Sequence, residues 1–313
     1  MISIWKTIGG KMQRIEQVEE NCWINMVDPD ETEISDIAKS VGVEQDLIRA
    51  ALDEEEVSYV YTTDEGSTLI TIDVPIVDSC CKEYSTTPMG IIFVGTRIIT
   101  VCIKESAVIS KFENSPPKKL STMDTAEFML MLIYGVADQY IEYLRHINRM
   151  AGDIEERLYK SQRNREVVEL LGLQKSLVFF STSLKANLVT LEKVTRIKTF
   201  KINEDDSEML GDVLIEVRQA IEMSTIFTDI LSGTMDAYAS IVSNNLNTIM
   251  KALTVITLIL TIPTMVFSYY GMNLEPLSML PFNNIGWFPL FLSIVMMVAI
   301  GLYFKAFHFS KKR

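Results

Sequence analysis

The most constraining feature of this chain is a stretch of 19 residues, Ala252–Tyr270, that contains no charged side chain. Folded as a helix at 1.5 Å per residue, it would be about 28 Å long, close to the thickness of the hydrocarbon core of a bilayer. A second uncharged stretch, Phe288–Phe304, follows it. We therefore expect two membrane-spanning helices, over about 252–270 and 287–304, joined by a loop over 271–286.

Basic residues flank this pair of stretches and are absent between them. Lys251 precedes the first stretch, and Lys305 and Lys311-Lys312-Arg313 follow the second. Because cytoplasmic flanks of membrane spans are enriched in Lys and Arg, the pattern predicts that both termini are cytoplasmic and that the loop faces outward. No apolar signal segment occurs in Met1–Gln17, so the first span is expected to anchor the chain in the inner or plasma membrane.

The residues before Lys251 form a strongly acidic body. They carry 24 Lys or Arg and 40 Asp or Glu, a formal charge of −16. Nucleic-acid binding usually requires a basic patch, whereas an acidic surface concentrates cations. The chain has no Gly-rich phosphate loop, no HExxH motif and no nucleophile elbow, so a membrane-tethered enzyme is disfavoured. We expect neither an enzyme nor a nucleic-acid partner.

The first 120 residues alternate helical patterns with runs rich in Val, Ile, Thr and Tyr, which is typical of an α/β domain. Strands are expected over Val57–Thr62, Ser67–Val74, Met89–Val94 and Arg97–Lys104, and helices over Asp30–Ser40 and Glu44–Leu52. Gly95-Thr96 predicts a hairpin between the last two strands. In a reducing cytosol the cysteines are expected to be free thiols: Cys22, Cys80, Cys81 and Cys102.

Long helical patterns follow the Ser115-Pro116-Pro117 breaker. Apolar residues recur with helical periodicity from Thr125 to about Leu158 and again over 167–194, which predicts two long packed helices. A third helix is expected to begin in the acidic segment 203–208, whose carboxylates complement the positive end of a helix dipole. If it continues to Tyr270, it would be about 100 Å long at 1.5 Å per residue.

Together these assignments predict an α+β membrane protein in three parts. An N-terminal cytosolic α/β domain would cover residues 1–120, a long-helix stalk 121–250, and a transmembrane domain of two helices 251–313. The third helix would join the last two parts. Pro263 is its one internal breaker, and membrane helices tolerate such a residue.

Polar side chains of the third helix recur at alternating intervals of three and four residues. In the first apolar stretch every hydroxyl occupies such a position: Thr254, Thr257, Thr261, Thr264 and Ser268. The same phase continues toward the N-terminus through Met250, Asn247, Ser243, Ser240, Asp236, Gly233, Asp229 and Glu222. We call these thirteen positions the polar stripe. The spacing places them on one helix face, and its 3.5-residue period predicts left-handed supercoiling of several such helices around an axis.

Two interpretations of the hydroxyls remain open from their spacing. Ser and Thr in membrane helices can bond their own i−4 carbonyl or mark helix contacts, and they can also line a pore. The carboxylates of Asp229 and Asp236 favour a water-filled channel, because buried unpaired carboxylates would be costly. A tail-anchored sensor or binding module without transport would need no polar stripe through the membrane.

The motif Tyr270-Gly271-Met272-Asn273 ends the first span and precedes a short loop and a second span. In this arrangement the chain resembles the CorA family of magnesium channels. The likeness extends over residues from Leu170 onward, including Leu173–Leu177, Asp236-Ala237-Tyr238 and Asn247–Leu253. The resemblance implies a homopentamer in the lipid bilayer, with the first membrane helices lining a pore and cytosolic domains sensing Mg²⁺. Magnesium would then be both the transported and the regulatory ion.

The resemblance also assigns roles to residues. The outer mouth would comprise Gly271, Met272, Asn273 and Glu275, with Asn273 amides contacting the water shell of an ion that dehydrates reluctantly. The pore lining would comprise Asp236, Ser243, Asn247, Met250, Leu253, Thr254, Thr257, Thr261, Thr264 and Ser268. Met250 and Leu253 would form an apolar constriction. Asp212 matches a family position at which carboxylates bind a regulatory ion between subunits.

The identity of the ion follows from the same motif. Zinc-transporting members of the family usually lack Met at the position of Met272, so the resemblance favours magnesium over zinc. Many members carry Met-Pro-Glu in the loop, where this chain has Met279-Leu280-Pro281-Phe282, and Glu275 is left as the only acidic residue there. We expect passive magnesium uptake, with zinc, cobalt or nickel transport as the alternative within the family.

Overall fold

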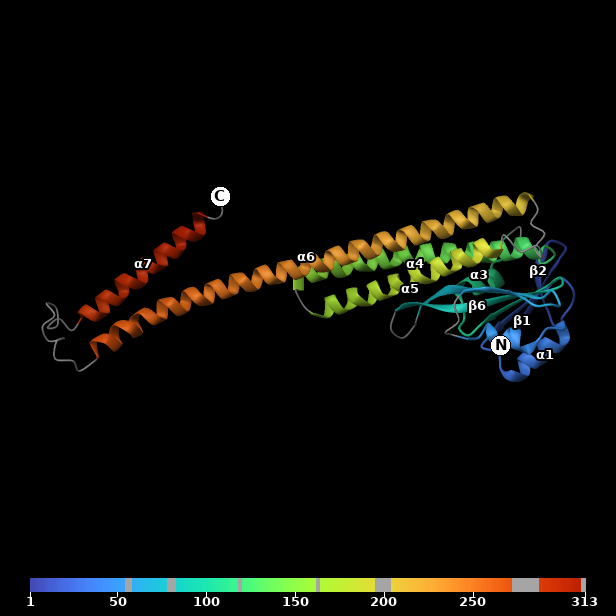
Figure 1. Ribbon diagram of the computed structural model, residues 1–313, viewed down its shortest axis with the longest axis horizontal. Helices are drawn as coiled ribbons and strands as arrows, with labels where there is room; N and C mark the ends of the chain where they lie inside the picture. The colour runs from blue at the N-terminus through green and yellow to red at the C-terminus, as the bar shows by residue number, and fades with distance from the viewer. Residues whose placement is uncertain are drawn as a thin grey trace. The chain divides into compact units, whose positions relative to one another are not determined.

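The runs of β-branched residues pair into one seven-stranded sheet (Figure 1). Its strands are β1 Ile2–Ile8, β2 Lys11–Ile15, β3 Cys22–Val27, β4 Val60–Thr62, β5 Thr68–Val77, β6 Tyr84–Val94 and β7 Arg97–Cys102. In space they follow the order β2-β1-β3-β7-β6-β5-β4. The β3–β7 pair is parallel and joins two antiparallel groups of strands. This computed structural model describes residues 1–53, 58–77, 83–117, 120–161, 164–194, 204–271 and 287–310.

The predicted hairpin at Gly95-Thr96 is confirmed, because Val94 pairs with Arg97 in an antiparallel ladder. Strands β5, β6 and β7 lie where the sequence placed strands, although β6 begins earlier, at Tyr84. The first expected strand is shorter, over Val60–Thr62, and Val57 lies outside the described residues. Strands β1 to β3 are additional to the prediction. The sequence feature that marks β1 and β2 is Gly9-Gly10, because its φ angles of 58° and 76° form the turn between these two strands.

Helices α1, Glu31–Val41, and α2, Gln45–Ala50, cover one face of the sheet. Helix α1 begins where the sequence placed it, after the N-cap residue Asp30. Asp30 Oδ1 accepts a hydrogen bond from the Glu33 N–H at 2.7 Å, and Glu33 Oε2 accepts one from the Asp30 N–H at 3.1 Å. This capping box satisfies donors that a helix end would otherwise leave unpaired.

Helices α3 Ala107–Asn114, α4 Thr125–Ser161 and α5 Asn164–Val194 cover the opposite face of the sheet (Figure 1). The ring of Trp23 packs on Phe128 of α4, with centroids 5.3 Å apart, and Tyr140 of α4 packs on Phe180 of α5 at 5.0 Å. The two long packed helices expected after the proline breaker are therefore confirmed, and α3 is an additional helix.

A reciprocal pair of hydrogen bonds fastens α5 to strand β5. Asn187 Nδ2 donates to the Asp73 carbonyl at 2.8 Å, and the Asp73 N–H donates to Asn187 Oδ1 at 2.8 Å. Tyr140 Oη also donates to the Asp73 carbonyl, at 3.1 Å. Burial raises the pKa of the Asp73 carboxyl, an effect that a hydrogen bond from Ser183 opposes. The amide of Asn187 and the backbone of Asp73 are therefore partnered, which fixes the position of α5, although the buried hydroxyls of Thr71 and Thr190 have no hydrogen-bond partner among the described residues.

Helix α6 extends from Glu204 to Tyr270 without a break, and Pro263 lies inside it. It starts in the acidic segment that predicted it. Helix α7, Phe288–Ser310, follows. The chain divides into two compact units, Met1–Thr234 and Met235–Arg313, so α6 belongs to both.

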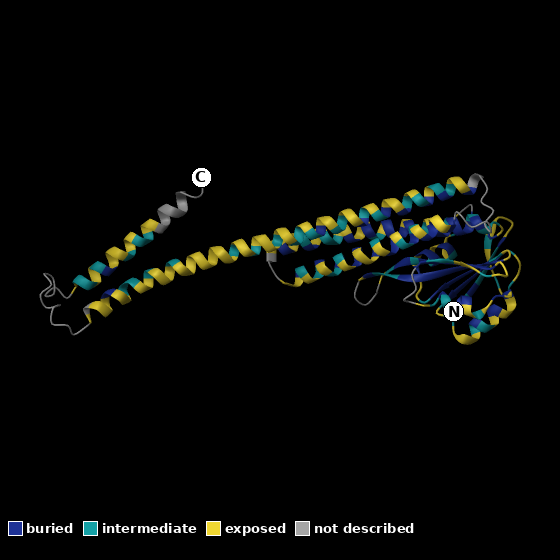
Figure 2. Cartoon of the chain, viewed as in Figure 1, coloured by how far each residue is buried: buried dark blue, intermediate teal, exposed yellow. Residues whose placement is uncertain are grey.

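Two helices, α5 and α6, are long and apolar enough to cross a membrane by length and composition, and Phe288–Tyr303 of α7 is a shorter apolar helix. In the apolar window of α5, 39% of the residues are buried, compared with 11% in that of α6. Figure 2 shows the same difference along the two helices. Because α5 packs on the sheet, it is a core helix of the first unit.

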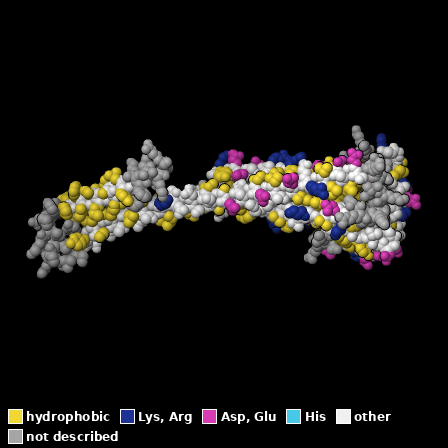
Figure 3. All heavy atoms as spheres, turned by 45° about the horizontal axis from the view of Figure 1, so that its top comes forward, with side chains coloured by type: hydrophobic (Ala, Val, Ile, Leu, Met, Phe, Trp, Pro, Cys, Tyr) yellow, Lys and Arg dark blue, Asp and Glu magenta, His cyan; other side chains and the backbone are white. Residues whose placement is uncertain are grey.

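Apolar side chains dominate the described surface of the second unit, whereas charged side chains gather over the first (Figure 3). On α6 the exposed residues include Leu253, Ile256, Leu258, Leu260, Met265 and Phe267, and on α7 Phe291, Val298 and Leu302. Exposed apolar surface of this extent marks a membrane or protein contact.

Two of the four cysteines lie in the described part of the chain. Cys22 and Cys102 are both buried, and both are free thiols, as expected. Burial raises the pKa of Cys102 to about 12. Cys80 and Cys81 lie outside the described residues.

Gly90 of β6 provides a test of the packing between the sheet and α2. A Cβ atom at this position would overlap the Cβ of the buried Ala51. We expect Gly90→Ala to lower the free energy of unfolding by about 1–3 kcal/mol, the usual cost of overpacking. Thermal unfolding of the full chain in detergent, followed by tryptophan fluorescence, measures this. Gly152→Ala is the matched control, because nothing lies within 4 Å of its added Cβ. Equal unfolding temperatures for the two variants would contradict the packing.

Candidate functional site

The polar stripe of α6 is uncovered along its whole length. All thirteen of its positions, from Glu222 to Ser268, are exposed in the chain. Each lies within the single uninterrupted helix, so the spacing seen in the sequence is realised as one continuous face.

The less exposed residues of α6 lie on the opposite face. In the second unit they include Val255, Ile259, Ile262 and Val266, and Val266 is only 8% exposed. Each lies two residues away from a stripe hydroxyl, which is about 200° around a helix. In the first unit Ser224 and Leu231 are buried with the same offset from Glu222 and Gly233. The chain therefore packs one side of α6 and leaves the polar side open, except over 246–254, where every residue is exposed.

The stripe threonines use their donors within the helix. Thr254 Oγ1 donates to the Met250 carbonyl at 2.8 Å, and Thr257, Thr261 and Thr264 make the same i−4 bond at 2.9, 2.8 and 3.1 Å. For the hydroxyl donors, the interpretation that Ser and Thr bond their own i−4 carbonyl is therefore correct. The hydroxyl lone pairs remain free to accept, and a hydrated cation presents the hydrogens of its water shell to such acceptors.

Toward the N-terminus the stripe changes from hydroxyls to other chemistry. Met250 of the stripe is 57% exposed. Leu253, which lies beside the stripe about one helical turn further on, is 54% exposed, so a thioether and an isobutyl group are close together on the helix surface. Asn247, Ser243 and Asp236 follow, all exposed. We call Met250 and Leu253 the apolar step. It separates the hydroxyls from Thr254 onward from the amide of Asn247, the hydroxyl of Ser243 and the carboxylate of Asp236.

The end of α6 places Gly271 against the last helical turn. Its N–H donates to the Phe267 carbonyl at 2.9 Å, and a Cβ atom at this position would lie 3.0 Å from that oxygen. A side chain would therefore crowd the helix end. Met272, Asn273 and Glu275 lie outside the described residues, so their place at an outer mouth stays a prediction.

Asp212 lies in a pocket of about 750 Å³ between α3, α4 and the start of α6, whose lining is mostly apolar and includes Lys111. Asp138 and Glu216, which the sequence did not single out, share the pocket with Tyr134. The charge of Glu216, then burial and the charges of Asp138 and Asp212, raise the pKa of the Tyr134 phenol. Among the described residues, no group of three His, Cys, Asp or Glu is arranged to hold a metal ion. The pocket thus carries negative charge without a complete metal cage.

Helix α5 holds the first part of α6 through polar contacts that the sequence did not reveal. Ser224 Oγ donates to the Leu177 carbonyl at 3.0 Å, and Gln174 Nε2 donates to Ser232 Oγ at 2.9 Å. Ser224 and Ser232 are eight residues apart and lie outside the stripe phase, a spacing that could have marked a second, packed polar face. Within the first unit, these contacts leave Glu222, Asp229 and Gly233 exposed.

The comparisons with known proteins define the class. A family model described as "CorA-like Mg2+ transporter protein" matches residues 18–309. A cobalt/magnesium transport protein CorA from Methanocaldococcus jannaschii is 28% identical over 267 residues, which cover 84% of this chain and 82% of the relative. A magnesium transport protein CorA from Helicobacter pylori is 22% identical over 308 residues, covering 94% and 92% of the two chains.

Solved structures show the same fold. The complete structure of the CorA magnesium transporter from Methanocaldococcus jannaschii superposes with a TM-score of 0.83 at 22% identity and covers 98% of this chain and 96% of that one. Full-length CmaX gives a TM-score of 0.73 at 14% identity, with coverages of 99% and 96%. The fold is therefore that of the full-length CorA structure, with a soluble α/β domain, a long helix and candidate membrane helices near the C-terminus. The chain belongs to the CorA family of divalent-cation transporters.

Water contact along the stripe can be tested by cysteine labelling. In a background without Cys80 and Cys81, we expect Thr261→Cys to react with a charged methanethiosulfonate at least about tenfold faster than Leu260→Cys, because the thiolate that reacts forms only in water. Both positions are exposed in the single chain, so they are matched. Rates in reconstituted membranes give the comparison. Equal rates would mean that the stripe does not face water.

Proposed function

We propose that this protein is a homopentameric channel for magnesium uptake, gated by intracellular Mg²⁺. The observation that carries the proposal is the uncovered polar stripe of α6, which lies opposite the packed face of the same helix. A ring of copies supplies the contact that the single chain lacks, because several stripes then face one axis. The 3.5-residue period is the period of such an assembly.

The proposed topology has two spans, at 252–270 and 287–304, with the loop 271–286 outside the cell. Lys251 and the basic C-terminal residues support this orientation, since Lys and Arg favour the cytoplasmic side. Residues 1–120 and 121–250 are then the cytosolic domain and its stalk, and 251–313 is the membrane domain. The apolar exposed surface of the second unit suits contact with lipid.

Selection in this proposal acts on the hydrated ion. Mg²⁺ dehydrates reluctantly and usually keeps several waters when bound. Asn273 offers amide oxygens at the outer mouth, and the threonine stripe offers hydroxyl lone pairs, because its donors are bonded within the helix. Both groups accept hydrogen bonds from the water shell. Glu275 adds the only negative charge of the loop.

The proposed gate is the apolar step at Met250 and Leu253. A ring of these side chains excludes water when it narrows, and a dewetted constriction blocks an ion that carries its water shell. Asn247, Ser243 and Asp236 provide polar contacts on the cytosolic side of that step. An inside-negative potential drives entry, since it contributes about 2.3 kcal/mol per charge per 100 mV and acts twice on a divalent ion.

Regulation is proposed at Asp212. Its pocket already carries Asp138 and Glu216, and their combined negative field raises the pKa of Tyr134. The described residues of one chain do not complete a metal cage, so the remaining ligands would come from a neighbouring copy. Mg²⁺ bound there would link two subunits and hold the pore closed when its internal concentration is high.

Flux measurements in liposomes test the transport proposal. We expect purified protein to carry Mg²⁺ inward, and Asn273→Ala to lower the rate about tenfold or more, because an amide ring loses hydrogen bonds worth about 1 kcal/mol each. A dye inside the liposomes reports Mg²⁺, and parallel assays with Co²⁺ and Zn²⁺ rank the ions.

Asn283→Ala is the matched control for this assay, because it removes the same amide from the same loop. Its rate should equal that of the unmodified protein. Absence of flux for every ion, or equal loss in the two asparagine variants, would refute the proposed ion path.

The regulatory proposal predicts that Asp212→Asn weakens inhibition by internal Mg²⁺. The concentration for half-inhibition should rise about tenfold, the effect of losing one charged ligand contact. The measurement is flux against internal Mg²⁺ in inside-out vesicles. Asp153→Asn, an exposed carboxylate of α4, is the control and should leave the inhibition curve unchanged. An unchanged curve for Asp212→Asn would remove this residue from the mechanism.

A further inference from the structure

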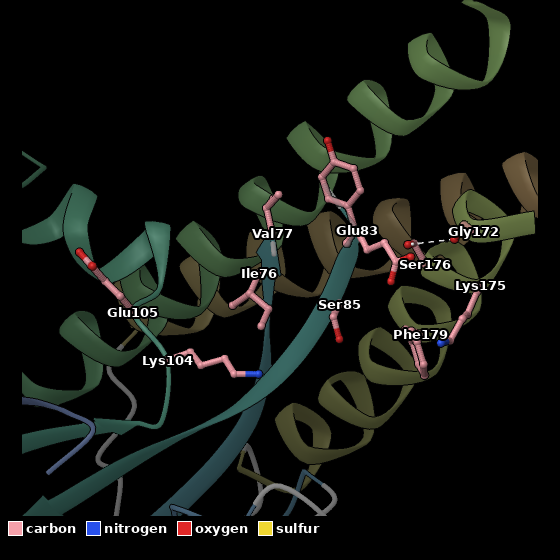
Figure 4. A pocket seen from close by; sticks show the side chains of 11 residues that line it. Ile76, Val77, Glu83, Ser85, Lys104, Glu105, Gly172, Lys175, Ser176 and Phe179 are labelled. Carbon is pink, nitrogen blue, oxygen red and sulfur yellow. Dashed lines mark hydrogen bonds between the residues drawn. The ribbon is translucent and has the colours of Figure 1, made fainter. Parts of the chain in front are cut away.

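A second cavity of the first unit lies between α5 and the ends of β5 and β6, away from the Asp212 pocket (Figure 4). Its volume is about 530 Å³. Cavities of about 300–1,000 Å³ are the size that holds small organic ligands. The proposed ion path makes no use of it.

Two lysines reach into this cavity from opposite sides. Lys104 follows β7 and Lys175 lies on α5, and Figure 4 shows the Ser85 hydroxyl between their ammonium groups. Within the described part of the chain, neither ammonium forms an ion pair; the Lys175 Nζ lies over the Phe179 ring instead, 5.6 Å from its centroid. In a body with a formal charge of −16, two such lysines in one cavity favour an anion.

An aromatic ring forms part of the same wall. Phe179 is 41% exposed, and its face lies beside Lys175 in Figure 4. Exposed aromatic rings in basic cavities are stacking platforms for nucleobases, which all have a π-face. The combination of ring and ammonium therefore suits a ligand that is both anionic and aromatic.

Ser176 and two carboxylates, Glu83 and Glu105, also line the cavity. Ser176 Oγ donates to the Gly172 carbonyl at 3.2 Å, which leaves its lone pairs available, and the Glu83 carboxylate lies next to it in Figure 4. Carboxylates commonly accept hydrogen bonds from ribose hydroxyls. The second carboxylate, Glu105, accepts a bond from Ser110 Oγ at 2.9 Å and is directed away from Lys104. The acidic groups thus leave the two lysines free for phosphate.

We propose that this cavity binds a nucleoside polyphosphate. Lys104, Lys175 and Ser85 contact the phosphates, Glu83 accepts from the ribose hydroxyls, and Phe179 stacks on the base. Each part of a nucleotide thereby meets a group of matching chemistry in one cavity of suitable size.

Direct binding to the full-length protein in nanodiscs tests this proposal. Calorimetry with ATP, adenosine and inorganic tripolyphosphate, each at a fixed free Mg²⁺ concentration, separates the contributions of base and phosphate. ATP should bind more tightly than either fragment. Because no ion flux is measured, the result is independent of whether the transport proposal holds.

Variants locate the site. Lys104→Ala and Lys175→Ala should each weaken ATP binding about tenfold, the effect of losing a charge-assisted contact. Lys185→Ala, an exposed lysine elsewhere on α5, should have no effect. Phe179→Leu should weaken ATP binding about fivefold or more and leave tripolyphosphate binding unchanged, since only the base stacks. Unfolding temperatures of all variants confirm that they remain folded.

Three outcomes would overturn the proposal. The first is no ATP binding at millimolar concentration. The second is ATP binding that Lys104→Ala and Lys175→Ala leave unchanged, which would place the nucleotide elsewhere. The third is tripolyphosphate binding as tight as ATP binding with no effect of Phe179→Leu, which would make the cavity a site for inorganic polyanions.

Discussion

The architecture of this protein depends on one constraint: a backbone in hydrocarbon must satisfy its own hydrogen bonds. Helix α6 is one uninterrupted helix over Glu204–Tyr270, so its backbone bonds lie within the helix, except that Pro263 has no N–H to donate. Its threonines follow the same rule, because each donates to the carbonyl four residues earlier. The four stripe threonines therefore add no unsatisfied donor to the apolar part of α6 and still offer acceptors outward.

The first unit holds the N-terminal part of α6 through polar contacts. Asn187 and Asp73 fasten α5 to the sheet through two reciprocal hydrogen bonds, and Ser224 fastens α6 to α5. Each link is buried or partly buried and fully partnered, so rotation of α6 would leave polar groups without partners. Within the first unit, the sheet thereby determines which face of α6 is packed.

Sequence reasoning reached the elements whose signals are local and missed those that depend on tertiary partners. Helix α6 was predictable because its 67 residues contain one proline. The hairpin over 94–97 was predictable because the turn needs a positive φ, which glycine adopts easily; Gly95 has a φ of 60°. Strands β1 and β2 lack strict alternation, since they lie at one edge of the sheet and are only partly buried. Lys104 and Lys175 line one cavity although they are far apart in the chain, and no local sequence pattern reveals this. The roles of Met272, Asn273 and Glu275 stay predictions.

Hydropathy alone does not separate α5 from α6, because both are apolar enough to cross a membrane. Their polar residues separate them. In α5 Asn187 and Ser183 are buried and bonded to sheet residues, so these two polar groups are partnered inside the first unit. In α6 the stripe from Asp236 to Ser268 is exposed on the side opposite the buried Val266. A helix whose polar face is partnered belongs to a core, and one whose polar face is uncovered requires water or further copies beside it. That difference, more than the length or hydrophobicity of α6, is the physical basis for assigning it the ion path.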